Sequence, residues 1–333
     1  MMLLWLSFLF ADERALQAKT NTVEASLKSE GTFVRALWML QHYGTNQSTD
    51  PQRDGQLKGT LARALAKDGV LAQDELGEFM DSKTFQRLAG EDSRMDKMEI
   101  DRSLDALASP SRSALTAQAR EHAAYLTTTF DRVEPGHREA VKKLADWIVA
   151  KYRPGERLEI IVVCTGNSRR SILGSSMGNL AAAYYGFSEI GFHSGGTDPT
   201  AFNPRTIAAL REIGFKIEAT GNEALRGELK TANPIYRVEW GTGMEMLEYS
   251  KHYGDSSNPQ SQFAALMVCT EADAGCPVVQ GASLRLSMPF LDPKTYDDGK
   301  YESVKYAERR DDIGRTLLSA FAQARRAIGT KWP

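Results

Sequence analysis

Residues 158–163 read LEIIVV and lead directly into CTGNSRRS, residues 164–171. A continuous apolar run that is rich in β-branched residues is typical of a strand buried in a parallel sheet. The segment that follows, residues 172–185, has the length and apolar character of a helix. The sequence therefore predicts a strand, a tight loop and a helix in succession, an arrangement of the α/β class.

The loop in this unit begins at Cys164 and ends at Arg170. Backbone N–H groups between a strand and a helix N-terminus turn toward one point, and the helix dipole adds partial positive charge there, so that an oxyanion fits. The same donors would stabilise the thiolate of Cys164 and make it a nucleophile at neutral pH. Arg170 can hold two oxygens of the anion in its planar fork, and the hydroxyl of Ser171 can donate a hydrogen bond to the thiolate. We expect the oxyanion-binding loop to consist of Thr165, Gly166, Asn167, Ser168, Arg169 and Ser171.

The composition excludes several classes of protein. With 42% hydrophobic and 25% charged residues, the chain is not mainly disordered and not a multi-spanning membrane protein. Its net charge of -2 gives no overall attraction to nucleic acid or to an anionic membrane. Three cysteines in 333 residues are too few for a disulfide framework, and all three lie in the second half. If cysteines do chemistry here, the second half does it.

The length favours two domains. Apolar residues recur at Val141, Leu144, Ala145 and Ile148, which predicts an amphipathic helix that Pro154-Gly155 ends. Weaker helical patterns precede it, in residues 32–42, 73–88 and 111–129. We therefore expect an all-α domain of unknown role over residues 12–155 and a catalytic domain over residues 156–330.

The first eleven residues, MMLLWLSFLFA, are almost wholly apolar. A bilayer span needs about 20 apolar residues, so this segment is not one. It is similar to the apolar part of a signal peptide but lacks a basic start, and the alternative is a helical turn packed on the domain. We expect a cytoplasmic protein unless residues 1–11 act as an export signal.

Asp68-Gly69 followed by Glu75 looks like the second part of an EF-hand calcium loop. The first two ligand positions would then be Ala64 and Ala66, which cannot coordinate a cation. We expect a turn before the next helix rather than a calcium site. The five histidines lack ligand-like spacing, so no zinc site and no other metal site is expected.

Four segments of the second half carry a resemblance to a known family. In chain order they are IIVVCTGNSRRS, SGGTDPTAFNPRTIAALREIGF, LMVCTEADAGCP and the DP of PFLDPKTYDDG. Together they resemble the low-molecular-weight protein tyrosine phosphatase superfamily and, within it, look most like the thioredoxin-coupled arsenate reductases, over about Leu158 to Ile328. The resemblance implies a flavodoxin-like parallel sheet with helices on both faces and a site at the carboxyl ends of the strands.

The resemblance also implies a general acid in an Asp-Pro loop, and Asp292-Pro293 matches its place. Such an acid protonates a leaving oxygen. Asp198, Asp297 and Asp298 are the alternatives, and we prefer Asp292 because Asp198-Pro199 fits the loop after the second strand.

Cys269 and Cys276 have the spacing of the downstream pair in the thioredoxin-coupled arsenate reductases. The implied mechanism begins when Cys164 attacks arsenate. Cys269 then attacks the adduct, and Cys276 closes a Cys269–Cys276 disulfide that an external dithiol such as thioredoxin reduces. The alternative is that Cys269 and Cys276 are inert packed thiols. No bound cofactor is expected.

The sequence departs from the family pattern in three places. Arg169 stands where these families commonly have another cysteine, and Ser175 stands where they usually have a glutamate that in some arsenate reductases helps to hold a potassium ion. The segment 219–262 is longer than its counterpart, which indicates a lid or a substrate-selecting insert.

Three functions stay open at this point. The first is arsenate reduction through Cys164, Cys269 and Cys276. The second is a protein tyrosine phosphatase, a hydrolase that works through a phosphocysteine at Cys164 with Arg170 and Asp292. The third is an oxyanion sensor that binds phosphate or arsenate without turnover.

Overall fold

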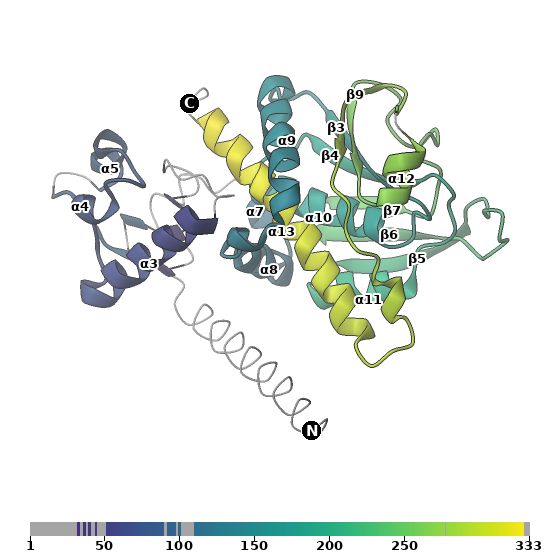
Figure 1. Cartoon of the computed structure of the whole chain (residues 1–333), viewed down its shortest axis with the longest axis horizontal. Helices are drawn as coiled ribbons and strands as arrows, with labels where there is room; N and C mark the ends of the chain where they lie inside the picture. Colours follow the sequence, from purple (N-terminus) through teal and green to yellow (C-terminus); the bar gives the residue numbers. More distant parts are fainter. Residues whose placement is uncertain are drawn as a thin grey trace, which may run out of the picture.

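A computed structural model describes residues 51–89, 92–97, 99–100, 110–276 and 278–329, together with a few positions between 32 and 44 (Figure 1). The apolar segment 1–11 and most of the helical pattern in residues 32–42 lie outside the described residues. In the described part, no helix combines the length and the hydrophobicity needed to cross a bilayer.

The centre of the molecule is a four-stranded parallel sheet. Its strands are β3 (Leu158–Cys164), β4 (Ile190–Gly196), β8 (Phe263–Met267) and β9 (Ala282–Ser287). They lie in the order β4-β3-β8-β9, so β3, the first of them in the chain, has a neighbouring strand on each side. Six of the seven residues of β3 are buried, as its continuous apolar run predicts. The expected α/β class, with a parallel sheet flanked by helices, is confirmed.

Two helices, α10 (Arg170–Tyr184) and α13 (Glu302–Gly329), pack against each other, and α10 packs against β3 and β4. The ring of Phe321 in α13 lies 5.8 Å from that of Phe192 in β4. All of α10 is buried, and two of its glycines let it lie close to the strands. A Cβ on Gly174 would lie 2.6 Å from a methyl group of Val162, and one on Gly178 would lie 2.2 Å from the ring of Phe192. The long helix α13 crosses the molecule diagonally in Figure 1.

Three helices that precede the sheet share its core. They are α7 (Pro110–Ala114), α8 (Ala117–Thr127) and α9 (Arg138–Lys151), with the short 3₁₀ turns η1 (Phe130–Arg132) and η2 (Pro135–His137) between them. The expected apolar face of α9 is buried, and both α8 and α9 pack on α13. The domain boundary near residue 155 stays a prediction.

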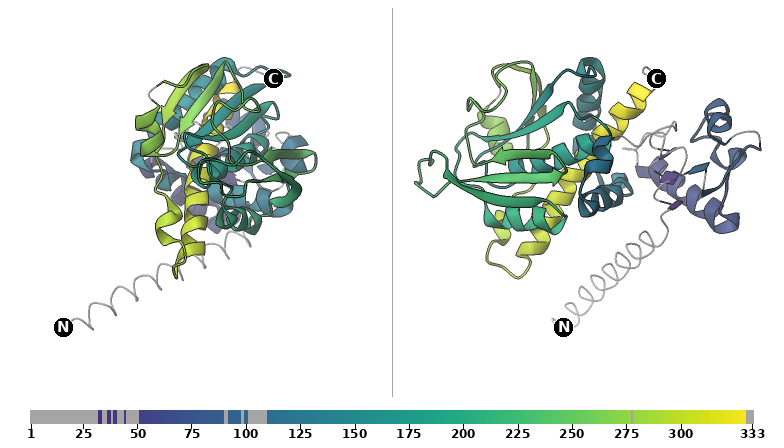
Figure 2. Two further views of the ribbon diagram at one scale, coloured as in Figure 1. Left: turned by 90° about the vertical axis from the view of Figure 1, so that its right-hand side faces the viewer. Right: turned by 180° about the vertical axis from the view of Figure 1, so that it is seen from behind.

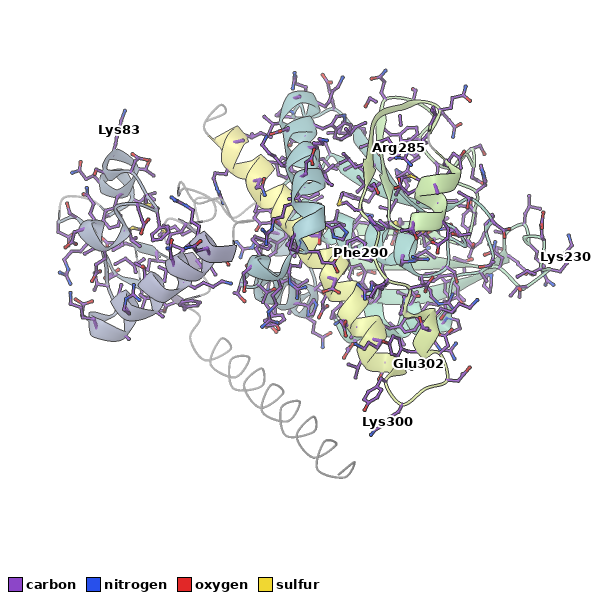
Figure 3. The ribbon with its side chains drawn as sticks, viewed as in Figure 1. Lys83, Lys230, Arg285, Phe290, Lys300 and Glu302 are labelled. Carbon is purple, nitrogen blue, oxygen red and sulfur yellow. The ribbon has the colours of Figure 1, made fainter. Side chains whose placement is uncertain are left out.

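The segment between the second and third strands of the parallel sheet builds a separate antiparallel sheet. After α11 (Pro204–Glu212), the strands β5 (Lys216–Glu223), β6 (Pro234–Gly241) and β7 (Met244–Glu248) pair in chain order. Figure 2 shows them from behind, on the side away from α3–α5. The hairpin between β5 and β6 projects outward, with Lys230 at its tip (Figure 3). The long segment expected as an insert is therefore largely this sheet and the loop after it.

The described N-terminal residues form α3 (Pro51–Asp68), α4 (Gln73–Leu76) and α5 (Ser82–Ala89), with two-residue strands β1 (Leu71–Ala72) and β2 (Arg94–Met95) paired to each other. The single helical pattern expected over residues 73–88 is thus divided in two. Lys58 of α3 pairs with Asp131 of η1 at 2.6 Å. The all-α character of residues 12–155 stays a prediction, since many of them lie outside the described part.

Candidate active site

The loop after β3 runs from Thr165 to Arg169 and turns into α10 at Arg170. Its carbonyl oxygens face outward and accept hydrogen bonds from the neighbouring chain: those of Thr165, Gly166 and Ser168 bind the amides of Asp198, Thr200 and Asn203 at 2.9, 3.0 and 3.2 Å. Within the described part of the chain, the amides of residues 165–169 donate to no other residue. The loop therefore has N–H groups that are free to bind an oxyanion.

Two backbone positions allow this tight turn. Asn167 has φ of +40°, in the left-handed region. Gly196, at the end of β4, lies so close to the loop that a Cβ there would be 2.4 Å from the carbonyl oxygen of Thr165 and 2.8 Å from the amide of Asn167. A side chain at residue 196 would push the loop out of place.

Cys164 ends β3 beneath the loop and is 4% exposed. Its Sγ lies 3.1 Å from Oγ of Ser171. The side-chain amide of Asn167 donates to the same Oγ at 2.9 Å. Because the Ser171 oxygen already accepts from Asn167, its own hydrogen is free to point at the sulfur. This geometry allows Ser171 to donate a hydrogen bond to the sulfur of Cys164, while the ionisation of Cys164 stays a prediction.

Arg170 opens α10 with its guanidinium buried beside the loop. Nη1 donates to the carbonyl oxygen of Phe290 at 3.0 Å, and Nη2 pairs with Oδ2 of Asp292 at 2.7 Å. Nε is buried and has no hydrogen-bond partner in the described part of the chain. A buried guanidinium N–H without an acceptor is costly, so this N–H is available to an acceptor from outside the chain. Figure 3 shows Phe290 in the interior, between α13 and the sheet.

The structure separates the four candidate acids. Asp292 is the one that touches Arg170. Asp297 binds Arg169, and Asp298 is 89% exposed and pairs with Arg205. Asp198 is exposed. Asp292 is therefore the carboxyl group nearest the guanidinium of Arg170, while its role as an acid stays a prediction.

Cys269 and Cys276 flank a short helix, α12 (Thr270–Gly275). Cys269 is fully buried, and its Sγ lies 3.5 Å from Oγ1 of Thr165 in the loop and accepts from the amide of Ala272 at 3.3 Å. Burial raises the pKa of the Cys269 thiol, although Thr165 and the Ala272 amide favour the thiolate. Cys276 is half-buried, with its Sγ 4.0 Å from the hydroxyl of Tyr253. All three thiols are free, and the second one reaches the loop that holds the first.

Two groups of polar contacts around the loop have no local signature in the sequence. In the first, Arg169 donates to the hydroxyl of Tyr306 at 2.6 Å and pairs with Asp297 at 2.7 Å. Tyr306 is 1% exposed, so it is a buried contact rather than a surface residue. This group ties the loop to the segment that follows Asp292 and to α13.

The second group lies behind the loop and centres on Glu248, the last residue of β7. It includes Ser175, whose hydroxyl donates to Glu248 at 3.0 Å. Ser175, one of the positions at which the sequence departs from the pattern it resembles, thus binds a glutamate from the antiparallel sheet. In the described residues, no group of three or more His, Cys, Asp or Glu side chains could hold a metal ion.

A cavity of about 500 Å³ opens between β4 and β7. Phe192, Met246 and Trp240 form apolar walls, and Ser194 and Lys251 lie at its inner end. It does not include Cys164 or Arg170, so it is distinct from the loop site.

The EF-hand-like turn has no set of calcium ligands. Asp68 pairs with Arg94 at 2.6 Å, and a backbone hydrogen bond from Val70 together with that charge lowers its pKa. Glu75 accepts from the amide of Ala72 at 3.0 Å and lies 3.4 Å from Lys67. Both carboxylates already have cationic partners within the chain.

Comparison with known proteins finds a distant relative for half of the chain. No family model matches the sequence. The chain is 23% identical over 167 residues to arsenate reductase 1 of Staphylococcus epidermidis, a stretch that is 50% of this chain and 97% of that protein. This similarity suggests a related family and is consistent with an enzyme. The other half of this chain lies outside the match.

Proposed function

We propose that the protein is a cysteine-dependent oxyanion enzyme that reduces arsenate to arsenite. One observation carries the proposal: the sulfur of Cys164 lies beneath unpaired loop amides and beside Arg170, while Cys269 contacts the same loop through Thr165. A phosphate-binding loop alone would serve a hydrolase, whereas a second thiol in contact with that loop suits a thiol-disulfide relay. The strand order β4-β3-β8-β9 supports a flavodoxin-like fold with the site at the carboxyl ends of the strands.

The reaction proceeds in balanced steps. The thiolate of Cys164 attacks arsenic, an S–As bond forms, and one oxygen takes up protons and leaves as water. Cys269 then attacks the sulfur of Cys164: the S–S bond forms, the S–As bond breaks, and its electron pair stays on arsenic, which leaves as arsenite. Arsenic gains two electrons and two thiols are oxidised. Cys276 attacks Cys269 and frees Cys164, and an external dithiol such as thioredoxin reduces the Cys269–Cys276 disulfide by exchange.

The protein's own groups prepare this sequence. The loop amides and Arg170 bind the anion and balance its charge. The hydroxyl of Ser171 lies 3.1 Å from the sulfur of Cys164, where it can donate a hydrogen bond to the attacking group. Burial keeps Cys269 protonated at rest, so it reacts only after the adduct has formed beside it.

Low-molecular-weight tyrosine phosphatase activity is the second candidate, and the position of Asp292 favours it. Its carboxyl group lies 2.7 Å from Arg170, where an acid could protonate a leaving phenol. Arsenate reduction has no such leaving group. Under this alternative, Cys164, Arg170 and Asp292 suffice, and both downstream cysteines are dispensable.

Parallel assays of the full chain separate the two functions. Arsenate turnover is followed as NADPH oxidation with thioredoxin and thioredoxin reductase, and hydrolysis is followed with p-nitrophenyl phosphate. We expect Cys276→Ser to abolish arsenate turnover and to leave hydrolysis unchanged, while Cys164→Ser abolishes both. Full arsenate turnover in Cys276→Ser, or none in the unmodified protein, would reject the reductase.

A further inference from the structure

The loop that follows β7 buries a carboxylate and an ammonium group behind the phosphate-binding loop. The side chains of Glu248 and Lys251 are 1% and 6% exposed, and their Oε1 and Nζ atoms lie 3.2 Å apart. Burying such a pair takes both charges out of water, and a pair of this kind is often no more stabilising than apolar residues of the same size. Stability alone therefore gives no reason for this pair.

Glu248 accepts hydrogen bonds on both oxygens. Oε1 accepts from the hydroxyl of Ser194 at 2.7 Å and from the amide of Tyr249 at 3.2 Å, and Oε2 accepts from the hydroxyl of Ser175 at 3.0 Å. An ionised carboxylate can only accept. The Ser194 hydroxyl therefore points its hydrogen at Glu248, while the Ser175 hydroxyl lies within reach of both Glu248 and the carbonyl oxygen of Ile172 at 3.1 Å.

This direction is passed on to the nucleophile. Since Ser194 gives its hydrogen to Glu248, its oxygen is left to accept from Nδ2 of Asn167 at 2.7 Å. The same Nδ2 gives its other hydrogen to Ser171 at 2.9 Å, and Ser171 then has its own hydrogen left for Cys164. The backbone amide of Lys251 donates to Oδ1 of Asn167 at 2.7 Å and so fixes which way this side-chain amide faces.

We propose that Glu248 and Lys251 are positioning residues that orient a chain of hydrogen bonds from Ser194 through Asn167 and Ser171 to the sulfur of Cys164. Glu248 accepts the hydrogen of Ser194 and so leaves the Ser194 oxygen to Asn167, and Lys251 pairs with the carboxylate of Glu248 while its backbone amide orients Asn167. The antiparallel sheet thus acts on the nucleophile from behind rather than by closing over it. The inference rests on the proposed role of Cys164 as the nucleophile.

Glu248→Gln is the sharpest test because it keeps the shape of the side chain. A carboxamide can donate to the oxygen of Ser194 and displace Nδ2 of Asn167 from it, which shifts the Asn167 side chain and weakens the hydrogen bonds from Asn167 to Ser171 and from Ser171 to the Cys164 sulfur. Loss of one hydrogen bond to a charged group corresponds to about a tenfold change or more in an equilibrium. We expect the rate at which iodoacetamide labels Cys164 at neutral pH to fall about tenfold, and the rate in strongly alkaline buffer, where the thiol is ionised in any case, to stay unchanged.

The labelling is measured on the full chain by mass spectrometry of the Cys164 peptide, with thermal unfolding recorded for each variant. Ser194→Ala breaks the same chain of hydrogen bonds without touching a charge and should slow labelling in the same direction. The matched control is Lys216→Met, which removes an exposed ion pair with Glu239 on the same antiparallel sheet and should leave the labelling rate unchanged.

A further variant separates the charge of Lys251 from its bulk. Lys251→Ala opens space at the inner end of the cavity between β4 and β7, through which methylammonium chloride can enter. We expect slow labelling of Cys164 in this variant and faster labelling when methylammonium is added, with no effect of choline chloride, whose cation is too large.

The proposal is overturned if folded Glu248→Gln labels at the rate of the unmodified protein. If Glu248→Gln does not fold, Ser194→Ala decides: a normal rate rejects the proposal and a slowed rate supports it. The proposed function is tested separately. It fails if iodoacetamide labels Cys164 selectively but the protein does not turn over arsenate.

Discussion

Arg169 joins the loop after β3 (residues 165–169) to the segment that carries Asp292. Its guanidinium contacts Asp297 at 2.7 Å and Tyr306 at 2.6 Å, and Tyr306 also donates to Asp297 at 2.7 Å. Three side chains from three parts of the chain thus close a small ring of hydrogen bonds. The ring holds the guanidinium of Arg169 on Asp297, so we expect Arg170 to bind the anion.

Asp297→Asn tests what this ring contributes to stability. Burial raises the pKa of Asp297, but the hydrogen bond from Tyr306 and the charge of Arg169 outweigh it, and the pKa lies below its ordinary value. The stabilisation is therefore present above the unfolded-state pKa of about 3.9 and is lost as the pH falls through the lower folded-state pKa. We expect Asp297→Asn to reduce the free energy of unfolding by about 1–3 kcal/mol at neutral pH.

The measurement is urea unfolding at neutral pH and at a pH below about 4. The difference between Asp297→Asn and the unmodified protein should shrink at the lower pH. Asp298→Asn is the control, because Asp298 is 89% exposed and should change stability by less than about 0.5 kcal/mol. If Asp297→Asn lowers the free energy of unfolding equally at both pH values, the stabilisation does not come from the ionised carboxylate of Asp297.

The cysteines should differ in reactivity. Since burial raises the pKa of Cys269, this thiol stays protonated at neutral pH and iodoacetamide should label it more slowly than Cys164, with a rate that climbs as the pH increases. Peptide mass spectrometry of a time course gives the order directly. In denaturant all three cysteines should react alike, and rapid labelling of Cys269 in the folded protein would contradict this prediction.

Single residues also mark the limit of sequence reasoning. The placement of Cys164, Arg170 and Ser171 follows from a local pattern, because strand, loop and helix are consecutive. Glu248 lies 84 residues from the loop residue Cys164 by the numbering of the chain, and nothing in its neighbourhood in the sequence indicates a buried charge. Contacts of this kind arise only when distant elements pack.

At the scale of elements, the close contact between α10 and the sheet is the feature on which the loop depends. Gly178 contacts the ring of Phe192 so closely that a Cβ would lie 2.2 Å from it. Gly178→Ala improves helix propensity by up to about 1 kcal/mol, yet overpacking costs about 1–3 kcal/mol. We expect a net loss of stability, measured by thermal unfolding.

Gly59→Ala in α3 is the matched control for that substitution. A Cβ there would have only the flexible end of Arg63 near it, at 3.5 Å. The change should leave stability equal or raise it by about 0.4–1 kcal/mol. Stabilisation by Gly178→Ala would show that α10 can move away from β4.

The EF-hand-like turn gives a second prediction for an element. Titration of the full chain with calcium chloride in a calorimeter should show no saturable binding, because Ala64 and Ala66 offer no oxygen and Asp68 already pairs with Arg94. Saturable binding that Glu75→Gln weakens would contradict it.

The elements themselves were largely predictable. Hydrophobic periodicity predicted a helix through residues 141–148, where α9 (Arg138–Lys151) lies, and the apolar run predicted a strand over residues 158–163, where β3 (Leu158–Cys164) lies. The antiparallel sheet β5–β7 was not predicted, since its strands alternate little: seven of the eight residues of β5 are exposed. A lid loop and an exposed sheet both have polar residues in such a stretch. Only the pairing between strands distinguishes the two.

At the scale of the whole molecule, the helices before residue 155 belong to the packing of the sheet. Val141 and Leu144 of α9 and Leu318 and Phe321 of α13 are all completely buried, and α9 packs on α13. A chain shortened to residues 156–333 would expose these side chains to water. We expect it to aggregate, whereas a chain of residues 110–333 should elute as a single species in size-exclusion chromatography and label at Cys164. A soluble, reactive 156–333 chain would contradict this view.

The ion pair between Arg170 and Asp292 has a consequence for selectivity. The carboxylate of Asp292 is already paired with the guanidinium of Arg170, so it competes with any anion that binds there. Chloride, with a single charge and no second oxygen to share, gains little by displacing it. A tetrahedral dianion can bind the arginine and the loop at the same time. For such an anion, displacing the carboxylate of Asp292 from Arg170 is favourable.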